Sequence, residues 1–143
     1  MKTLESITFA AAVSSLILIS TNVSADVPAS CYEIVASYNY FNNSTTDVHK
    51  PKEIHIDVKR PDSGKANTEY VYDASNSKTP SGTVAYKWER VSGGFELLGP
   101  TDQATIKVKA AQSENGVNSY TRITVVDPVC GTSSEARIDV NYY

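Results

Sequence analysis

Few side chains in this sequence are placed to do chemistry. The two histidines are His49, expected in a polar loop, and His55, on the polar side of an alternating stretch. A hydrolase needs a nucleophile beside a base, or two opposed carboxylates in a cleft. The serines instead cluster in turn-forming segments, where their hydroxyls bond the backbone, and no Gly-x-Ser-x-Gly elbow is present. We therefore expect a protein that is not an enzyme and that needs no cofactor.

The beginning of the chain is typical of a secretory signal. Met1 and Lys2 form a short basic start, residues 7–19 are an apolar run, and Val23-Ser24-Ala25 suits signal peptidase. The run is too short for a spanning helix, and an N-terminal membrane anchor is the alternative. We expect residues 1–25 to be a cleaved signal peptide. Residues 26–143 then form a single domain that is secreted, periplasmic or extracellular, with no membrane span after cleavage.

The charged residues exclude one class of partner. The net charge is −3, and the acidic and basic residues are mixed along the chain. A nucleic-acid partner would require a basic stripe, and none is present. We therefore expect no nucleic-acid binding.

Only two cysteines occur, Cys31 near the start of the mature chain and Cys130 near its end. In an exported chain an even number of cysteines favours a disulfide, and two cysteines allow one intramolecular pairing. Such a bridge would contribute about 4–5 kcal/mol in the chain-entropy model. A redox or metal-binding thiol is the alternative, but neither cysteine has a second one within two or three residues. We expect a Cys31–Cys130 disulfide and no metal site.

The mature chain alternates apolar and polar residues in short runs separated by turn residues. This period of two indicates β-strands, and no stretch shows convincing helical periodicity. The expected strands are residues 31–41, 53–59, 69–74, 83–91, 95–98, 104–110, 117–127 and 135–143. Residues 42–47 are expected to form a turn. Trp88, the one tryptophan, lies on the core side of its strand. The pattern predicts an all-β antiparallel sandwich or barrel.

From Tyr70 onward the sequence resembles PKD-like and related immunoglobulin-like modules of exported proteins. The matching pieces are Tyr72-Asp73-Ala74-Ser75-Asn76-Ser77, Tyr86-Lys87-Trp88-Glu89-Arg90-Val91-Ser92-Gly93, Ile123-Thr124-Val125-Val126-Asp127 and Gly131-Thr132-Ser133-Ser134. Two features depart from that pattern. Val91-Ser92-Gly93-Gly94 stands where Gly-Asp-Gly is common, and Ser119 or Thr121 stands where the family places an inward aromatic residue.

The resemblance implies an immunoglobulin-like (PKD-like) β-sandwich of seven to nine strands, usually a non-catalytic spacer, adhesion or carbohydrate-associated module. It also implies that Asp73 and Asp127 cap turns at the ends of strands. Calcium coordination by these two carboxylates is the alternative.

Tyrosine is the most informative residue type, with nine copies against one tryptophan. Seven share the parity of aliphatic neighbours and are expected in the core. They are Tyr32, Tyr38, Tyr40, Tyr70, Tyr72, Tyr86 and Tyr142. Tyr120 and Tyr143 have the opposite parity and are expected outside.

If the strands that carry Trp88, Tyr120 and Tyr143 are neighbours, one outer face gathers aromatic, cationic and amide side chains. We name this the predicted contact face, and its members are Lys87, Tyr120, Arg122, Arg137, Asn141 and Tyr143, accompanied by Glu89, Thr124 and Asp139. Such a face suits a protein partner, since Tyr and Arg are enriched in hot spots, or a sugar ring. An ordinary solvated face with cross-strand charge pairs is the third interpretation.

These observations predict a secreted, non-catalytic binding module that recognises a protein partner or cell-surface component in adhesion or assembly. A module that binds chitin, another polysaccharide or a surface glycan is the alternative. Residues 53–59 are a candidate edge strand to which a partner's sheet could be added.

Overall fold

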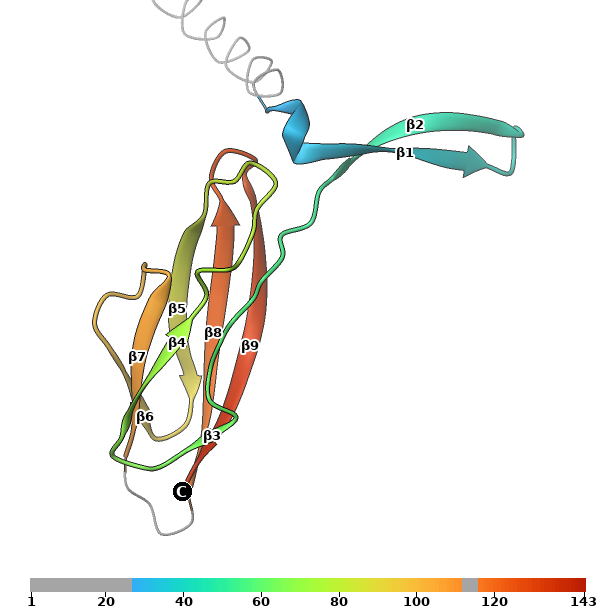
Figure 1. Ribbon diagram of the computed structural model, residues 1–143. Coiled ribbons are helices and arrows are strands. Elements are labelled where there is room, and N and C mark those ends of the chain that lie inside the picture. Colours follow the sequence, from blue (N-terminus) through green and yellow to red (C-terminus); the bar gives the residue numbers. More distant parts are fainter. Residues whose placement is uncertain (1–26, 112–115) are drawn as a thin grey trace, which may run out of the picture.

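The computed structural model describes residues 27–111 and 116–143, and strands dominate both ranges (Figure 1). The expected signal peptide lies outside the described residues. The elements in chain order are η1 (Ala29–Cys31), β1 (Tyr32–Asn39), β2 (Ser44–Pro51), β3 (Ser63–Gly64), β4 (Glu69–Asp73), β5 (Ala85–Ser92), β6 (Phe95–Leu98), β7 (Thr105–Ala110), β8 (Val117–Asp127) and β9 (Thr132–Tyr142). In the parts of the chain that the structure describes, no helix has the length and apolar character needed to cross a membrane.

Seven of these strands form two sheets that pack face to face. One sheet has the order β3-β9-β8-β5, and the other has the order β4-β7-β6. All pairings are antiparallel except the two-residue pairing of β3 with β9. The two sheets enclose one hydrophobic core, to which both contribute. The prediction of an all-β protein with antiparallel sheets is confirmed, as two layers of a β-sandwich.

The core is built around Trp88, which is 2 % exposed, as predicted. Its ring lies 6.3 Å from the ring of Tyr72 in the opposite sheet, and its indole N–H donates to the carbonyl of Gln103 at 2.8 Å. The hydroxyls of Tyr72 and Tyr142 meet at 2.8 Å and form a second link between the sheets. Burial and this hydrogen bond raise the pKa of Tyr142. A tyrosine whose hydroxyl finds such a partner can be buried at low cost.

β8 follows the predicted alternation closely. Its inner residues, which include Ser119 and Thr121, are buried, whereas Tyr120 and Arg122 on the outer face are only partly buried. Ser119 and Thr121 therefore occupy the inner positions, as their parity predicted. The Ser119 hydroxyl donates to the carbonyl of Val140 at 3.2 Å, which satisfies one of these two buried polar groups.

The prediction of a strand over residues 53–59 is wrong, although its inward side is correct. Ile54, Ile56 and Val58 pack against the core, but the segment makes only two isolated bridges, His55 with Lys78 and Lys59 with Asp73. The chain here passes from the edge of the sheet that contains β4 to β3, beside β9 in the other sheet. A segment that changes sheets cannot keep a continuous ladder with either one.

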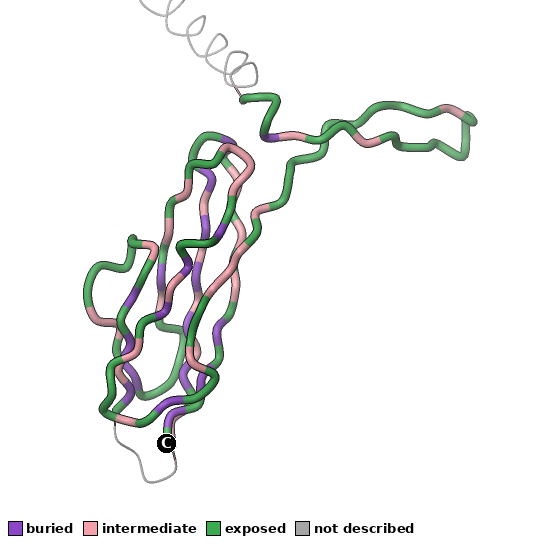
Figure 2. The backbone as a smooth tube through the Cα atoms, viewed as in Figure 1, coloured by how far each residue is buried: buried purple, intermediate pink, exposed green. Residues whose placement is uncertain are grey.

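The largest error concerns residues 31–41, predicted as one half-buried strand, and residues 42–47, predicted as a turn. They form a separate β1–β2 hairpin that projects away from the sandwich (Figure 1), so residues 44–47 belong to a strand. Figure 2 shows the hairpin as exposed along almost its whole length. Tyr38 and Tyr40 are 47 % and 87 % exposed, so their predicted place in the core is wrong. Alternation predicts that one face is apolar, but it does not reveal whether anything covers that face.

The predicted disulfide is present. Cys31 and Cys130 are bonded, with their Cα atoms 5.5 Å apart, and both side chains are buried. The bond joins the start of the hairpin to the turn between β8 and β9. The backbone N–H of Lys52 also donates to the carbonyl of Cys31 at 2.9 Å. The base of the hairpin is therefore fixed to one end of the sandwich, while its tip is not.

Candidate binding surfaces

The predicted contact face lies on the outside of the four-stranded sheet. Lys87 pairs across the strands with Thr124, Arg122 with Arg137, and Asn141 with Asn118. Directly opposed residues of antiparallel strands project to the same side. The predicted positions on β5, β8 and β9 are thus brought onto one surface. Tyr143 is 70 % exposed but lies past the end of β9. Tyr120 pairs with Asp139, four residues before Tyr143, so the backbone positions of the two tyrosines are offset by about 13 Å along the strand direction.

The side chains of this face are largely bound to one another. The Arg137 guanidinium lies 4.1 Å from the centre of the Tyr120 ring, and its Nε donates to Asp139 at 2.9 Å. This hydrogen bond raises the pKa of Arg137. The aromatic face of Tyr120 is therefore covered by a cation that would have to move before a sugar ring could stack there.

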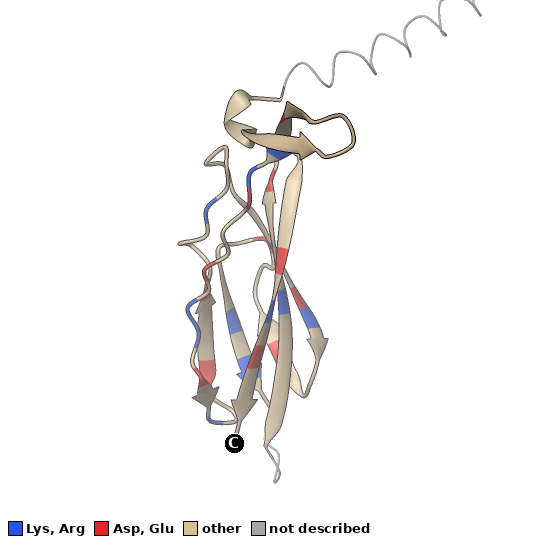
Figure 3. Ribbon diagram, turned by 90° about the vertical axis from the view of Figure 1, so that its right-hand side faces the viewer, with Lys and Arg blue, Asp and Glu red and all other residues tan. Residues whose placement is uncertain are grey.

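Glu89 lies between two cations of the same face. Its carboxylate is 2.9 Å from the Lys87 ammonium and 3.8 Å from the Arg122 guanidinium. The hydrogen bond from Lys87 lowers the pKa of Glu89. Along the described strands of the sandwich, the positions of acidic and basic residues are interspersed (Figure 3). This geometry fits the interpretation of a solvated face with cross-strand pairs.

The two histidines are both exposed. His49 is an exposed residue of β2, not of a loop as its surroundings predicted, and its ring lies 6.3 Å from that of Tyr32. His55 is exposed and bonds Lys78 through its backbone. Within residues 27–111 and 116–143, no three His, Cys, Asp or Glu side chains are grouped so that they could hold a metal ion.

Asp127 is a structural carboxylate at the sandwich end that carries the disulfide. It is fully buried and accepts hydrogen bonds from the N–H and hydroxyl of Ser81, at 2.9 and 2.7 Å. It also accepts from the N–H groups of Val129 and Cys130, at 3.1 and 2.9 Å. Burial raises the pKa of Asp127, but these hydrogen bonds outweigh burial and leave the pKa below its usual value. As the resemblance implied, Asp127 caps the turn that holds Cys130.

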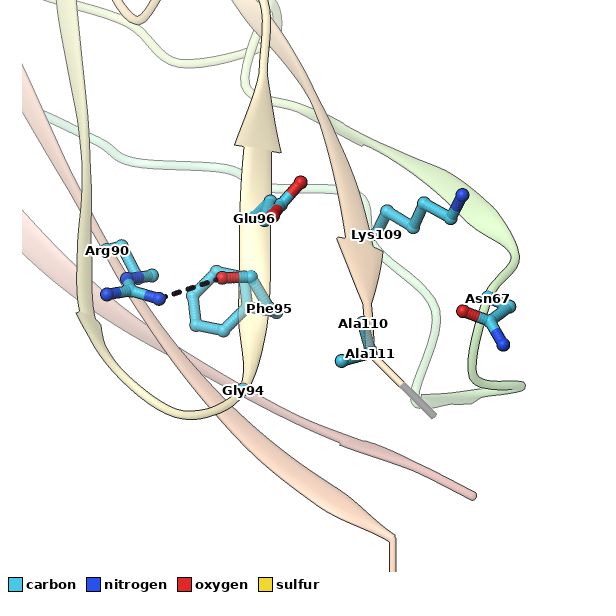
Figure 4. Close-up of a pocket in the computed structure, with 8 residues that line it drawn as sticks. All are labelled: Asn67, Arg90, Gly94, Phe95, Glu96, Lys109, Ala110 and Ala111. Carbon is cyan, nitrogen blue, oxygen red and sulfur yellow. Dashed lines mark hydrogen bonds between the residues drawn. The ribbon is translucent and has the colours of Figure 1, made fainter. Parts of the chain in front are cut away.

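A shallow pocket of about 430 Å³ lies at the other end of the sandwich, beside the β5–β6 turn (Figure 4). Phe95 and Ala110 form its floor, with Glu96 and Lys109 paired across the strands above them. The Arg90 guanidinium donates to the carbonyl of Phe95 at 3.1 Å. Among the described residues, the lining of this pocket includes one carboxylate, that of Glu96, and no Ser, Cys or His.

The tip of the hairpin presents the most exposed large hydrophobic side chains of the described residues, and sequence reasoning missed it. Tyr40 and Phe41 are 87 % and 102 % exposed, and Ile34 on β1 is 66 % exposed. No charged residue occurs between Glu33 and Asp47, which is the signal that could have drawn attention to this segment.

The tip is organised by its own polar side chains. The Tyr38 hydroxyl donates to the Asn43 side-chain carbonyl, and the Phe41 N–H donates to that of Asn39 at 2.9 Å. The rings of Tyr38 and Tyr40 meet edge to face with their centres 4.8 Å apart. Asn43 adopts a positive φ of 50°, a conformation that asparagine tolerates better than most residues. These local contacts leave Phe41 pointing into solvent.

Comparison with known proteins does not place this chain in a family, since no family model and no curated protein matches it. The resemblance to PKD-like modules therefore depends on the motifs and the strand arrangement of this chain alone.

Proposed function

We propose that this protein is an exported, non-catalytic, single-domain binding module of the immunoglobulin-like, PKD-like type, which recognises a protein partner in adhesion or assembly through the tip of its β1–β2 hairpin. The observation that carries the proposal is the exposure of Tyr40 and Phe41 at the tip of the hairpin, within residues 34–46, which include no charged residue. Large aromatic side chains are costly to expose and are enriched in the hot spots of protein interfaces.

The arrangement of the sandwich supports the immunoglobulin-like part of the proposal. Seven strands are divided four and three, and the strand with the buried Trp88 lies in the same sheet as the last two strands. In immunoglobulin-type sandwiches the tryptophan strand also pairs beside the last two strands. The disulfide differs, because it joins a sandwich turn to the hairpin and not the two sheets. The disulfide supports export, since such bonds persist in oxidising compartments.

The composition of the tip supports a protein as the partner. Residues 37–46 consist only of Ser, Tyr, Asn, Phe and Thr. Antibody loops are enriched in Tyr, Ser and Asn because rigid aromatic rings supply contact area while small polar groups supply hydrogen bonds. The predicted contact face, by contrast, has its Tyr120 ring covered by Arg137 and its Glu89 carboxylate beside Lys87 and Arg122. The hairpin tip is therefore the better candidate for the contact.

A pull-down with matched variants tests this assignment. The protein is immobilised and exposed to surface extracts of the source organism, in parallel with a Tyr40→Ser/Phe41→Ser variant and a Tyr120→Ala variant. We expect the wild type and Tyr120→Ala to retain the same protein and the tip variant to lose it. Equal retention by all three proteins would remove the tip from the interface.

A second arm addresses the carbohydrate alternative. The same proteins are incubated with chitin and other insoluble polysaccharides, and a glycan array is screened with the wild type. Binding to a polysaccharide that Tyr120→Ala abolishes and the tip variant retains would contradict our proposal and support the predicted contact face.

A further inference from the structure

We propose that the free edge of β1 pairs with β1 of a second copy of this chain, so that two hairpins form one four-stranded antiparallel sheet in the order β2-β1-β1-β2. This inference does not depend on the proposed function, because it concerns the strand edge and not the tip. Among the described residues, the two strands of the hairpin sheet pair only with each other. An isolated two-stranded hairpin is marginally stable in water, and three or more strands are needed for independent stability.

The edges of the sandwich and the edge of the hairpin differ in how they are protected. β5 carries Lys87, Glu89 and Arg90, and its register shifts before Ser92. Charged residues and irregularities of this kind are the common means by which exposed edges avoid pairing with other chains. β1 has neither proline nor bulge, and Glu33 is its only charged residue. Its edge is therefore open to another strand.

The second strand of the hairpin is a poorer candidate for that pairing. β2 carries Asp47 and Lys50, and it ends in Pro51, which has no N–H to donate. An antiparallel strand paired with β2 would lie beside these charged side chains and would lack a hydrogen bond at Pro51. The contrast within one hairpin therefore selects β1.

β1 is complementary to itself about Ala36. If Ala36 faces Ala36 of the second copy, Ile34 faces Tyr38 of that copy, and Tyr38 faces its Ile34. All three side chains lie on one face of the strand, because residues two apart in a strand share a face. Aromatic side chains opposite β-branched ones are among the favourable cross-strand pairs. Glu33 would face Asn39 of the second copy, so no like charges are opposed. Ile34 and Tyr38, which are 66 % and 47 % exposed in the single chain, would thereby gain partners.

The geometry also keeps the two sandwiches apart. Each disulfide lies at the start of β1, and the antiparallel arrangement places the two starts at opposite ends of the new sheet. A strand advances about 3.3 Å per residue, and Tyr32 of one copy would lie level with residue 40 of the other, so this offset of eight residues separates the two bases by about 26 Å. A two-fold axis through Ala36 produces a closed dimer, the commonest form of homo-oligomer.

Sedimentation velocity on the disulfide-bonded protein tests the proposal. We expect a concentration-dependent shift from monomer to dimer. Ala36→Lys puts two ammonium groups opposite each other in the dimer, while in its own hairpin the lysine lies opposite Asp47 and does not disrupt the pairing. It should raise the dimer dissociation constant about tenfold or more. Ala36→Gln is the neutral control and should change it little. Thr46→Lys adds the same charge to β2 and should also change it little.

Hydrogen exchange supplies an independent readout. Amides of β1 should become more protected as the protein concentration rises, and those of β2 should not, because β2 remains the outer strand. A protein that is monomeric at every concentration would overturn the proposal, and so would loss of the dimer in Thr46→Lys with retention in Ala36→Lys. A monomer that sediments with phosphatidylcholine vesicles would likewise overturn it, by assigning the hairpin to a lipid surface.

Discussion

Removing the disulfide should cost the sandwich much less stability than the length of the loop suggests. Cys31 and Cys130 are 99 residues apart, and closing a loop of that length in the unfolded chain is worth about 4.7 kcal/mol in the chain-entropy model. That figure applies only if Cys31 stays close to Cys130 in the folded protein after the bond is removed.

The structure indicates that Cys31 would not stay close to Cys130 once the bond is removed. The first residue after the hairpin that packs on the core is Ile54, and the isolated hairpin is only marginally stable. Without the bond, Cys31 would be attached to the folded sandwich through about 23 flexible residues. In the folded protein the bond therefore confines a loop of about 23 residues, which costs about 3.4 kcal/mol by the same relation. The difference, about 1.3 kcal/mol, is the expected loss of unfolding free energy in the Cys31→Ser/Cys130→Ser variant.

Guanidinium unfolding followed by tryptophan fluorescence measures this loss. Trp88 is the single tryptophan and lies in the core, so its fluorescence reports on the sandwich and not on the hairpin. Wild-type protein treated with a dithiol reductant is the matched control and should lose a similar amount. A loss of about 4–5 kcal/mol in both samples would refute the reasoning, because it would mean that the hairpin folds with the sandwich as one cooperative unit.

Three further variants test the packing of the sandwich. In Gly64→Ala the new Cβ would lie 2.7 Å from ring carbons of Tyr142, so we expect about 1–3 kcal/mol of destabilisation in denaturant unfolding. Gly94→Ala, whose Cβ would meet ordinary contacts at 3.6 Å, is the control. The buried hydroxyl of Thr121 has no hydrogen-bond partner among the described residues, so Thr121→Val should leave stability unchanged or raise it by about 1 kcal/mol. A clear loss in that variant would show that the hydroxyl is satisfied. Asp127 has a lowered pKa in the folded state, so below about pH 4 the unfolded chain binds more protons and stability falls as the pH falls. Acid unfolding by circular dichroism should show a weaker pH dependence in Asp127→Asn, which should also be about 1–3 kcal/mol less stable at neutral pH; an unchanged acid transition would contradict this assignment.

The strands of the sandwich could be predicted well from the sequence because each of them has one solvent-exposed face. On β9 the apolar residues Ala136, Ile138, Val140 and Tyr142 alternate with Arg137, Asp139 and Asn141, and one buried layer is enough to explain that pattern. Residues 53–59 share the alternation but change sheets, which depends on the position of β4 and β9 in space and not on local composition. The inward side of Ile56 was therefore predictable, while its lack of a ladder was not.

The candidate site was predicted in part for a related reason. Parity placed Tyr120 and Arg137 on one outer face, but it could not reveal that the guanidinium lies over the ring. That contact depends on side-chain rotamers and on cross-strand register. The hairpin was missed because its apolar residues, Ile34 among them, have the period of a core strand.

The hairpin strand β1 and the core strands both alternate, but they differ in the charged residues that flank their apolar positions. In β5 the apolar positions are flanked by Lys87 and Glu89, which hold the outer face in water and protect the edge. In β1 Glu33 is followed by Val35, Ser37 and Asn39 on its own face, so no residue of the strand after Glu33 carries a charge. Uncharged strand segments are common where a sheet is covered on both faces. Since the sandwich covers neither face of this hairpin, the composition of β1 after Glu33 supports the proposed contact with a second molecule.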